Sequence, residues 1–252
     1  MTYKIWFQGA TDKVHMAPYI AKVEAHLKGI LDPEFSATFH TTTPPATTTH
    51  AITEFRIARN LIRNAVEAEK QGYDAMVITH FQDAGLAEVK SVAEIPVIGL
   101  GETTLMHALT LGRKLGLVTI NPVFIPWHED QVIRYGLQQR VVGVRAVPAT
   151  VADFIDAFAS PEGLRKLKPL WEKECRALLD AGADVIVPAG GLPMMLFGGE
   201  FEGAPVVNGV TLVAKTAELA IKLRKQGMFK VSRRSNFVKP PEKALKEFLE
   251  QG

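Results

Sequence analysis

Short apolar runs rich in β-branched residues alternate along the chain with longer segments whose apolar residues recur at helical spacing. The first half contains the runs "KIWFQG", "ATFHTT", "AMVITH" and "PVIGL", and the second half contains "LGLVT", "VVGVRAV", "DVIVPA" and "PVVNG". Alternation of this kind is typical of strand and helix units on parallel sheets. The pattern therefore predicts an α/β protein with eight strands in two sets of four.

The two halves of the chain also resemble each other. "GYDAMVITH" begins at Gly72 and "GADVIVPAG" at Gly182, while "PVIGLGETT" begins at Pro96 and "PVVNGVTLV" at Pro205, so the two offsets are nearly equal. A repeat of this length is longer than a solenoid unit of about 20 to 50 residues. It predicts two pseudo-symmetric lobes, each a four-stranded, mainly parallel sheet flanked by helices. We expect residues 1–100 with 209–252 to form the first lobe and residues 101–208 to form the second.

Two such lobes facing each other place the carboxyl ends of both sets of strands along one cleft, where open α/β sheets bind ligands. Residues at the strand ends are therefore candidate site residues. By repeat position, His80 of the first lobe corresponds to Gly190 of the second. The candidates for substrate binding are Gln8, Thr43, Thr79, Phe81, Glu102, Thr119, Asn121, Gly190, Gly191 and Asn208.

Composition narrows the class of protein. The chain of 252 residues is 47% hydrophobic and 22% charged, with a formal charge of +2. Its basic residues are spread along predicted helices, which excludes a nucleic-acid footprint, and a local excess in the C-terminal tail is interpreted as solvated surface. No apolar segment approaches the roughly 20 residues that span a bilayer, and no signal-peptide pattern opens the chain. We expect a cytoplasmic protein without membrane or nucleic-acid partners.

Four segments in order resemble the aspartate/glutamate/hydantoin racemase superfamily, and most closely its hydantoin racemase branch. They are "GYDAMVITHFQDAGL", "IPVIGLGETTLMHALTLGRKLGLVTINP", "GADVIVPAGG" and "APVVNGV", and the resemblance extends from the first strand to about Lys225. It implies two lobes, a last helix that packs back on the first lobe, and a cofactor-independent active site between the lobes. The substrates it implies are small carboxylates and cyclic amides or imides.

The chain departs from this family at the catalytic positions. Racemases of the family use two cysteines, one from each lobe, to move a proton on opposite faces of a carbon next to a carbonyl. Here the two positions read His80 and Gly190, and the single cysteine, Cys175, lies within a predicted helix as a small buried hydrophobe. Glycine has no side chain that transfers a proton, so the sequence argues against two-base racemisation.

A single imidazole still suits one-sided chemistry, because the unperturbed pKa of histidine is about 6.5. Isomerisation, decarboxylation, elimination and activation of water for hydrolysis all remain open for His80. A non-catalytic, two-lobed protein that binds a small molecule is the alternative from another class. Asp83 is the second candidate catalytic residue, either as the carboxylate that orients the His80 ring or as a loop aspartate bonded to its own backbone.

Backbone groups are also candidates for holding an anion. "GLGETT" and "PVVNGVT" each lead into a predicted helix, whose first N–H groups favour a carboxylate. The glycines of "PAGG" suit either an anion nest or only a tight turn. Thr43 belongs to the loop "TTTPPATTTH", which either supplies hydroxyl groups to a substrate or is only a polar turn.

We predict no metal, because the "WHE" of Trp127 to Glu129 matches no metal-ligand spacing. The resemblance implies that no other cofactor is used. The open alternative is that His40, His50, His80 and His128 converge in three dimensions. The tail predicts a short helix near Pro241 with an apolar stripe at Leu245, Phe248 and Leu249. That stripe must pack on its own lobe or on a neighbouring subunit, and we expect a homo-oligomer.

Overall fold

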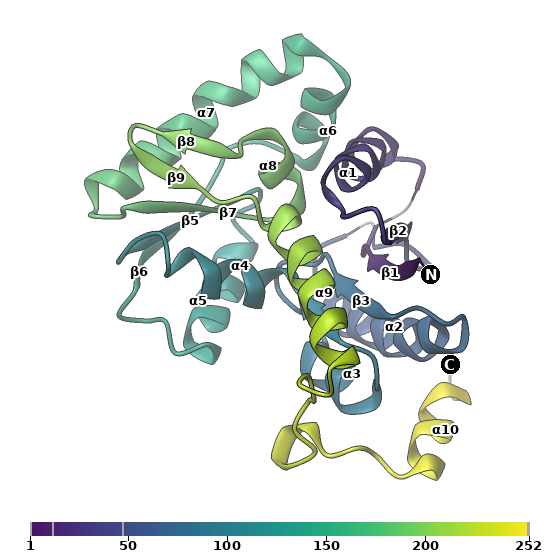
Figure 1. Ribbon diagram of the computed structural model, residues 1–252. Helices are drawn as coiled ribbons and strands as arrows, with labels where there is room; N and C mark the ends of the chain where they lie inside the picture. The colour runs from purple at the N-terminus through teal and green to yellow at the C-terminus, as the bar shows by residue number, and fades with distance from the viewer. Residues whose placement is uncertain (1, 12, 47, 251–252) are drawn as a thin grey trace.

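Two β-sheets, one in each half of the chain, organise the computed structural model, which describes residues 2–11, 13–46 and 48–250 (Figure 1). The first sheet contains four parallel strands in the order β2-β1-β3-β4. All residues of the central strand β3 are buried, as expected where helices cover both faces of a parallel sheet. The strands are β1 (Tyr3–Gln8), β2 (Phe35–His40), β3 (Ala75–Ile78) and β4 (Val97–Gly99).

The second sheet has one strand more than predicted. Its order is β6-β5-β7-β9-β8, and β8 pairs antiparallel with β9 in a hairpin that turns at Glu202 and Gly203. The prediction of four strands was wrong here because β8 has the sequence "GEF", in which Gly199 and Glu200 are exposed, and so lacks the apolar run that marks the other strands. The strands are β5 (Leu115–Thr119), β6 (Val141–Ala146), β7 (Val185–Ala189), β8 (Gly199–Phe201) and β9 (Ala204–Val206).

Helices connect the strands and cover both sheets. Local signals start several of them: Thr150 and Asp153 form a reciprocal capping box before α6, and the Ser160 hydroxyl accepts a hydrogen bond from the N–H of Gly163 at the start of α7. None of the described helices is long and apolar enough to cross a lipid bilayer. The helices before the tail are α1 (Ala17–Ile30), α2 (Ala51–Lys70), α3 (Leu86–Val92), α4 (Leu100–Ala108), α5 (Phe124–Arg134), α6 (Val151–Ala159), α7 (Pro161–Asp180), α8 (Gly191–Leu196) and α9 (Gly209–Lys225).

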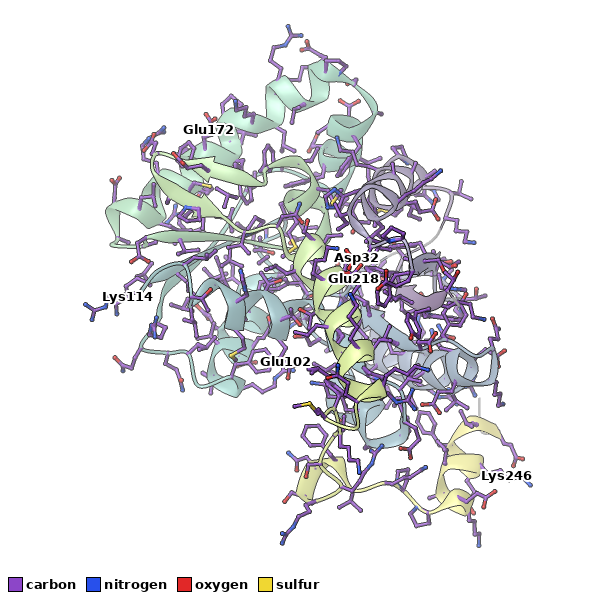
Figure 2. All side chains as sticks on the ribbon, viewed as in Figure 1. Asp32, Glu102, Lys114, Glu172, Glu218 and Lys246 are labelled. Atoms are coloured by element: carbon purple, nitrogen blue, oxygen red, sulfur yellow. The ribbon has the colours of Figure 1, made fainter. Side chains whose placement is uncertain are left out.

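Helix α9 leaves the second sheet and packs back on the first, against β3, β4 and α4 (Figure 1). Its inner face is apolar and its outer face carries an ion-pair cluster with the turn before β2. The Glu218 carboxylate accepts a hydrogen bond of 2.7 Å from the backbone N–H of Asp32 (Figure 2). The Nζ of Lys215 lies 2.9 Å from the side-chain carboxylate of Asp32 and 2.9 Å from that of Glu218. The helix that the resemblance implied on the first lobe is therefore α9.

The C-terminal tail also packs on the first lobe. Helix α10 (Glu242–Glu250) places Leu245 and Phe248 against the apolar cluster that α2 and α3 share. Arg63 of α2 donates a hydrogen bond of 2.8 Å to the carbonyl of Leu249. The apolar stripe of the tail therefore packs on the chain's own lobe, which is one of the two places predicted for it. The homo-oligomer stays a prediction.

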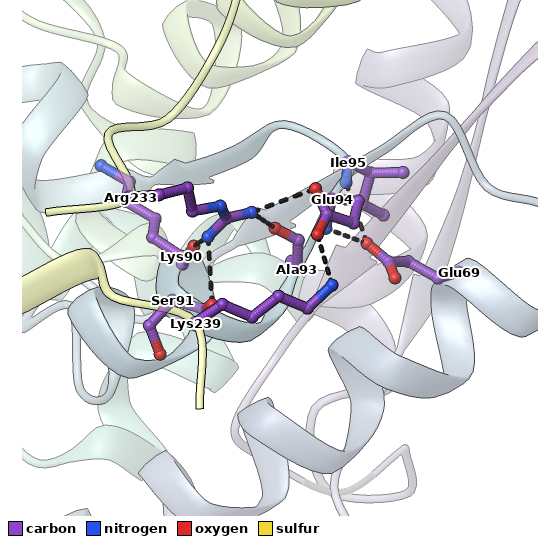
Figure 3. A network of polar contacts seen from close by, with 8 residues as sticks. All are labelled: Glu69, Lys90, Ser91, Ala93, Glu94, Ile95, Arg233 and Lys239. Carbon is purple, nitrogen blue, oxygen red and sulfur yellow. Dashed lines mark hydrogen bonds and ion pairs between the residues drawn. The ribbon is translucent and has the colours of Figure 1, made fainter. Parts of the chain in front are cut away.

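Arg233 fastens the segment between α9 and α10 to the end of α3 (Figure 3). Its guanidinium donates to the carbonyls of Lys90, Ser91 and Ala93 at 2.9, 3.0 and 2.7 Å, which are acceptors that the helix end leaves unpaired. Lys239 pairs with Glu94 in the same network. The basic residues of the tail were interpreted as solvated surface, and for Arg233 this was wrong because its side chain caps a helix.

Candidate active site

A cavity of about 260 Å³ lies where the carboxyl ends of the two sheets meet. Residues that follow β1, β3, β5 and β7 line it, so both halves of the internal repeat contribute. Residues of α1, α2, α5, α6 and α8 and part of the threonine-rich loop before α2 also line it. Of the residues predicted from strand ends, those on the wall are Thr79, His80, Phe81, Gly190 and Gly191.

His80 follows β3, and its imidazole contacts the carboxylate of Glu54, in the first turn of α2. The ring Nε2 lies 2.8 Å from one carboxylate oxygen of Glu54 and 3.0 Å from the other. The two side chains are only 14% and 20% exposed, so water screens the pair weakly. A carboxylate accepts hydrogen bonds, so the neutral imidazole carries its proton on Nε2 and keeps the lone pair on Nδ1. The pair has the arrangement of a base and the carboxylate that orients it.

Asp83 takes neither of the two roles predicted for it, because its carboxylate caps the distant helix α4 and His80 contacts Glu54. Its carboxylate accepts from the N–H groups of Gly101 and Glu102 at 3.1 and 2.6 Å, and from the Tyr135 hydroxyl at 2.6 Å. Burial raises the pKa of Asp83 to about 6. The anion at this helix start is thus a side chain of the protein itself, where a substrate carboxylate was predicted.

Helix α5 of the second half holds the loop that carries His80. Gln131 of α5 donates a hydrogen bond of 2.6 Å to the carbonyl of Phe81. Gly101 makes room for this contact, because a Cβ at that position would lie 2.1 Å from the Phe81 oxygen and 2.2 Å from the Gln131 amide. His128 is fully buried beside Gln131 and Thr119, at 3.2 Å from each, and burial lowers its pKa to about 4, which keeps it neutral.

The second half of the repeat presents glycine at the cavity. The N–H of Gly190 donates to the carbonyl of Pro188 at 3.0 Å, so it is engaged within the protein and does not form the anion nest considered from the sequence. Gly191 lies directly beneath the hydroxyl of Tyr19: an ideal Cβ at Gly191 would be 2.2 Å from that oxygen. A glycine is therefore required at position 191 to admit the tyrosine side chain.

The remaining predicted residues lie outside the described cavity wall, and four of them bond to the protein near their own strand ends. Gln8 accepts from Trp6 at 2.7 Å, and Thr119 contacts His128. Asn121 accepts from the N–H of Val123, and Asn208 caps α9 by accepting from the N–H of Thr211. These polar side chains stabilise the loops that follow the strands.

Glu102 and Thr43 complete the predicted set. Glu102 pairs with Lys90 of α3 at 2.6 Å, and Thr43 is exposed. The threonine-rich loop does reach the cavity, but it does so with Ala46, Thr48 and Thr49, whereas Thr47 lies outside the described residues. The loop therefore reaches the cavity, Thr43 is not among the residues on the wall, and substrate binding by the loop stays a prediction.

The four histidines considered as metal ligands do not converge. His40 stacks on Trp6 with ring centroids 3.4 Å apart, His128 bonds to Thr119 and Gln131, and His80 pairs with Glu54. His50 is exposed before α2. Among the residues that the structure describes, no three His, Cys, Asp or Glu side chains form a group that could hold a metal ion.

Comparison with known proteins gives a consistent set of relatives. The model of the Asp/Glu/Hydantoin racemase family matches residues 17–217. The chain is 32% identical to a hydantoin racemase of Pseudomonas sp. (strain NS671) over 72% of each chain, and 34% identical to one of Rhizobium meliloti over 60% of this chain and 62% of that one. Among solved structures, an allantoin racemase from Klebsiella pneumoniae has a TM-score of 0.78 at 20% identity, covering 96% of this chain and 95% of its own.

Proposed function

Because the chain belongs to the Asp/Glu/hydantoin racemase family, we propose that it is an isomerase-type enzyme that moves a proton at a carbon next to a carbonyl, with His80 as the base. One observation carries the proposal: the imidazole of His80 lines the cavity between the lobes and is paired with the carboxylate of Glu54. The position is also the one where the resemblance places the first catalytic thiol. No cofactor is required, because both proton transfers use the protein's own imidazole.

The walls of the cavity favour a neutral cyclic amide or imide over a carboxylate. Among the described lining residues, Glu54 is the side chain with a formal charge at neutral pH, and a negative charge repels a carboxylate. The rest of the wall is formed by small, hydroxyl or apolar groups such as Met16, Ile57 and Phe124. The relatives named above act, by their names, on hydantoins or allantoin, which are cyclic ureides without a carboxylate.

The proposed reaction is a proton transfer that the imidazole both starts and ends. Nδ1 of His80 takes the proton from the carbon, the C–H bond breaks, and its electron pair moves into the adjacent carbonyl to form an enolate. The imidazolium that results is stabilised by the Glu54 carboxylate, since hydrogen bonds between charged groups are stronger than neutral ones. The same imidazolium returns a proton to that face of the enolate, either to the original carbon or to another position that the enolate conjugates with.

Deuterium exchange tests this proposal. The protein is incubated in heavy water with 5-substituted hydantoins, free amino acids and malonates, and loss of the carbon-bound proton is followed by NMR together with optical rotation. We expect exchange with retained configuration for a hydantoin. His80→Ala should abolish exchange, while His107→Ala, which changes an exposed histidine on α4, should leave it intact. Exchange that survives in His80→Ala, or rapid racemisation by the unaltered protein, would contradict the one-base proposal.

A further inference from the structure

Tyr19 of α1 lines the cavity beside the residues that follow β7 of the second sheet. It lines the same cavity as His80, and its hydroxyl lies against Gly191, next to the position that the internal repeat pairs with His80. Tyr19 therefore brings a polar group to the half of the site where glycine has replaced the second catalytic side chain. The strand-end rule missed it because it lies on a helix, near the start of the chain.

The ring of Tyr19 is held in place from both lobes. Phe39 of β2 contacts it edge to face, with centroids 6.4 Å apart and ring planes at 87°, and Phe158 of α6 contacts it at 5.6 Å and 65°. Contacts of this geometry are favourable between aromatic rings. The hydroxyl is consequently presented in one fixed position.

The hydroxyl of Tyr19 has no hydrogen-bond partner among residues 2–11, 13–46 and 48–250, although the residue is only 6% exposed. A tyrosine this deeply placed normally gives its hydroxyl a partner. The Tyr19 oxygen is not one of the fully enclosed atoms that lack a partner, and the residue lines the cavity, so the hydroxyl opens on that space. By contrast, the hydroxyl of Tyr135, a partly buried tyrosine on α5, donates to Asp83. The partner of the Tyr19 hydroxyl is therefore to be sought in what fills the cavity.

We propose that the Tyr19 hydroxyl donates a hydrogen bond to a carbonyl oxygen of the cyclic amide substrate and holds that oxygen as it becomes an enolate. The inference rests on the proposed function, and it assigns the second-lobe side of the cavity a hydrogen-bond donor in place of a second base. Burial raises the pKa of Tyr19 above its ordinary value, so the phenol keeps its proton and acts as a donor. No bond in the tyrosine breaks during the reaction.

Tyr19→Phe tests the assignment, because it removes one oxygen and keeps the ring between Phe39 and Phe158. Loss of one donor to a developing oxyanion lowers kcat by about 100-fold, and loss of one neutral hydrogen bond weakens binding by up to about 10-fold. We expect both effects, measured as deuterium exchange of a 5-substituted hydantoin and as calorimetric binding of unsubstituted hydantoin. Tyr3→Phe, which changes a tyrosine at the far end of β1, is the matched control.

Thermal unfolding separates this role from a structural one. Tyr19→Phe should unfold at the same temperature as the unaltered protein, since the ring keeps its contacts with Phe39 and Phe158. Exchange and binding that Tyr19→Phe leaves unchanged overturn the role of Tyr19 and leave that of His80 standing. Exchange lost in Tyr19→Phe but kept in His80→Ala supports the tyrosine and overturns His80. An unaltered protein that neither binds nor exchanges hydantoin overturns both.

Discussion

The contact between Glu54 and His80 makes the sharpest quantitative prediction. Glu54→Gln keeps the length of the side chain and removes the negative charge beside the imidazole. Both carboxylate oxygens lie within 3.0 Å of Nε2. A hydrogen bond of this kind to a charged group contributes about 1.5 to 3 kcal/mol, and the partial exposure of both side chains places this pair near the middle of that range.

That charge matters most after the proton has moved, when the ring has become an imidazolium. A loss of about 2 kcal/mol at that stage lowers kcat by roughly 30-fold. KM should change little, because Glu54 contacts the ring at Nε2 and the proposed base is Nδ1. The assay is deuterium exchange of a hydantoin over a range of concentrations, with kcat and KM determined separately.

Glu67→Gln is the matched control, since Glu67 is an exposed glutamate further along α2. It should exchange deuterium at the rate of the unaltered protein. A kcat that Glu54→Gln leaves unchanged would refute the assignment of Glu54 as the partner of the base. An equal loss in both variants would show that the effect comes from the charge of the helix and not from this contact.

Three further predictions concern the site and its support. Gly191→Ala places a Cβ 2.2 Å from the Tyr19 oxygen, so it should lower the free energy of unfolding by about 1 to 3 kcal/mol. The loss should be smaller when Tyr19→Phe is also present. Urea unfolding of the unaltered protein, the two single variants and the double variant measures both effects. The pKa of Asp83 is raised from its ordinary value of 3.8 to about 6, so the folded protein holds a proton on this carboxyl more tightly than the unfolded chain does. The contribution of that proton to the free energy of unfolding is complete below pH 3.8 and is lost as the pH rises through 6. Stability should fall by about 3 kcal/mol over that window, and Asp83→Asn should flatten the dependence; a slope that the variant leaves unaltered would contradict this. Arg233→Ala removes three hydrogen bonds to the end of α3. Hydrogen exchange of the backbone amides of residues 229–250 should therefore accelerate, while enzymatic deuterium exchange of hydantoin is retained. Amide protection equal to that of the unaltered protein would show that the tail does not depend on Arg233.

The sequence was most informative where the signal was periodic. The alternation of short apolar runs and helical segments located eight of the strands, and the internal repeat predicted the two lobes and the contribution of both to one site. His80 was found because it ends a buried strand at a repeated position. These features depend on residues close together in the chain or on a comparison of the chain with itself.

The partners of these residues depend on contacts between distant segments. Glu54 and Tyr19 lie on helices, and nothing in their local sequence distinguishes them from other acidic or aromatic residues on a helix. The helix starts predicted to hold an anion are filled by Asp83 and Asn208, because a side chain of the protein reaches them first. Choosing between a substrate and an internal cap requires the three-dimensional path of the loops.

The hydrogen bonds from α5 to the loop after β3 have a consequence for the history of the fold. Gln131 and Tyr135 belong to the second half of the repeat, yet they hold the loop that carries His80 of the first half. A duplicated half expressed alone would lack these donors, and the loop would lose its anchor. The two halves thus depend on each other: the half that carries His80 does not contain everything that keeps His80 in position.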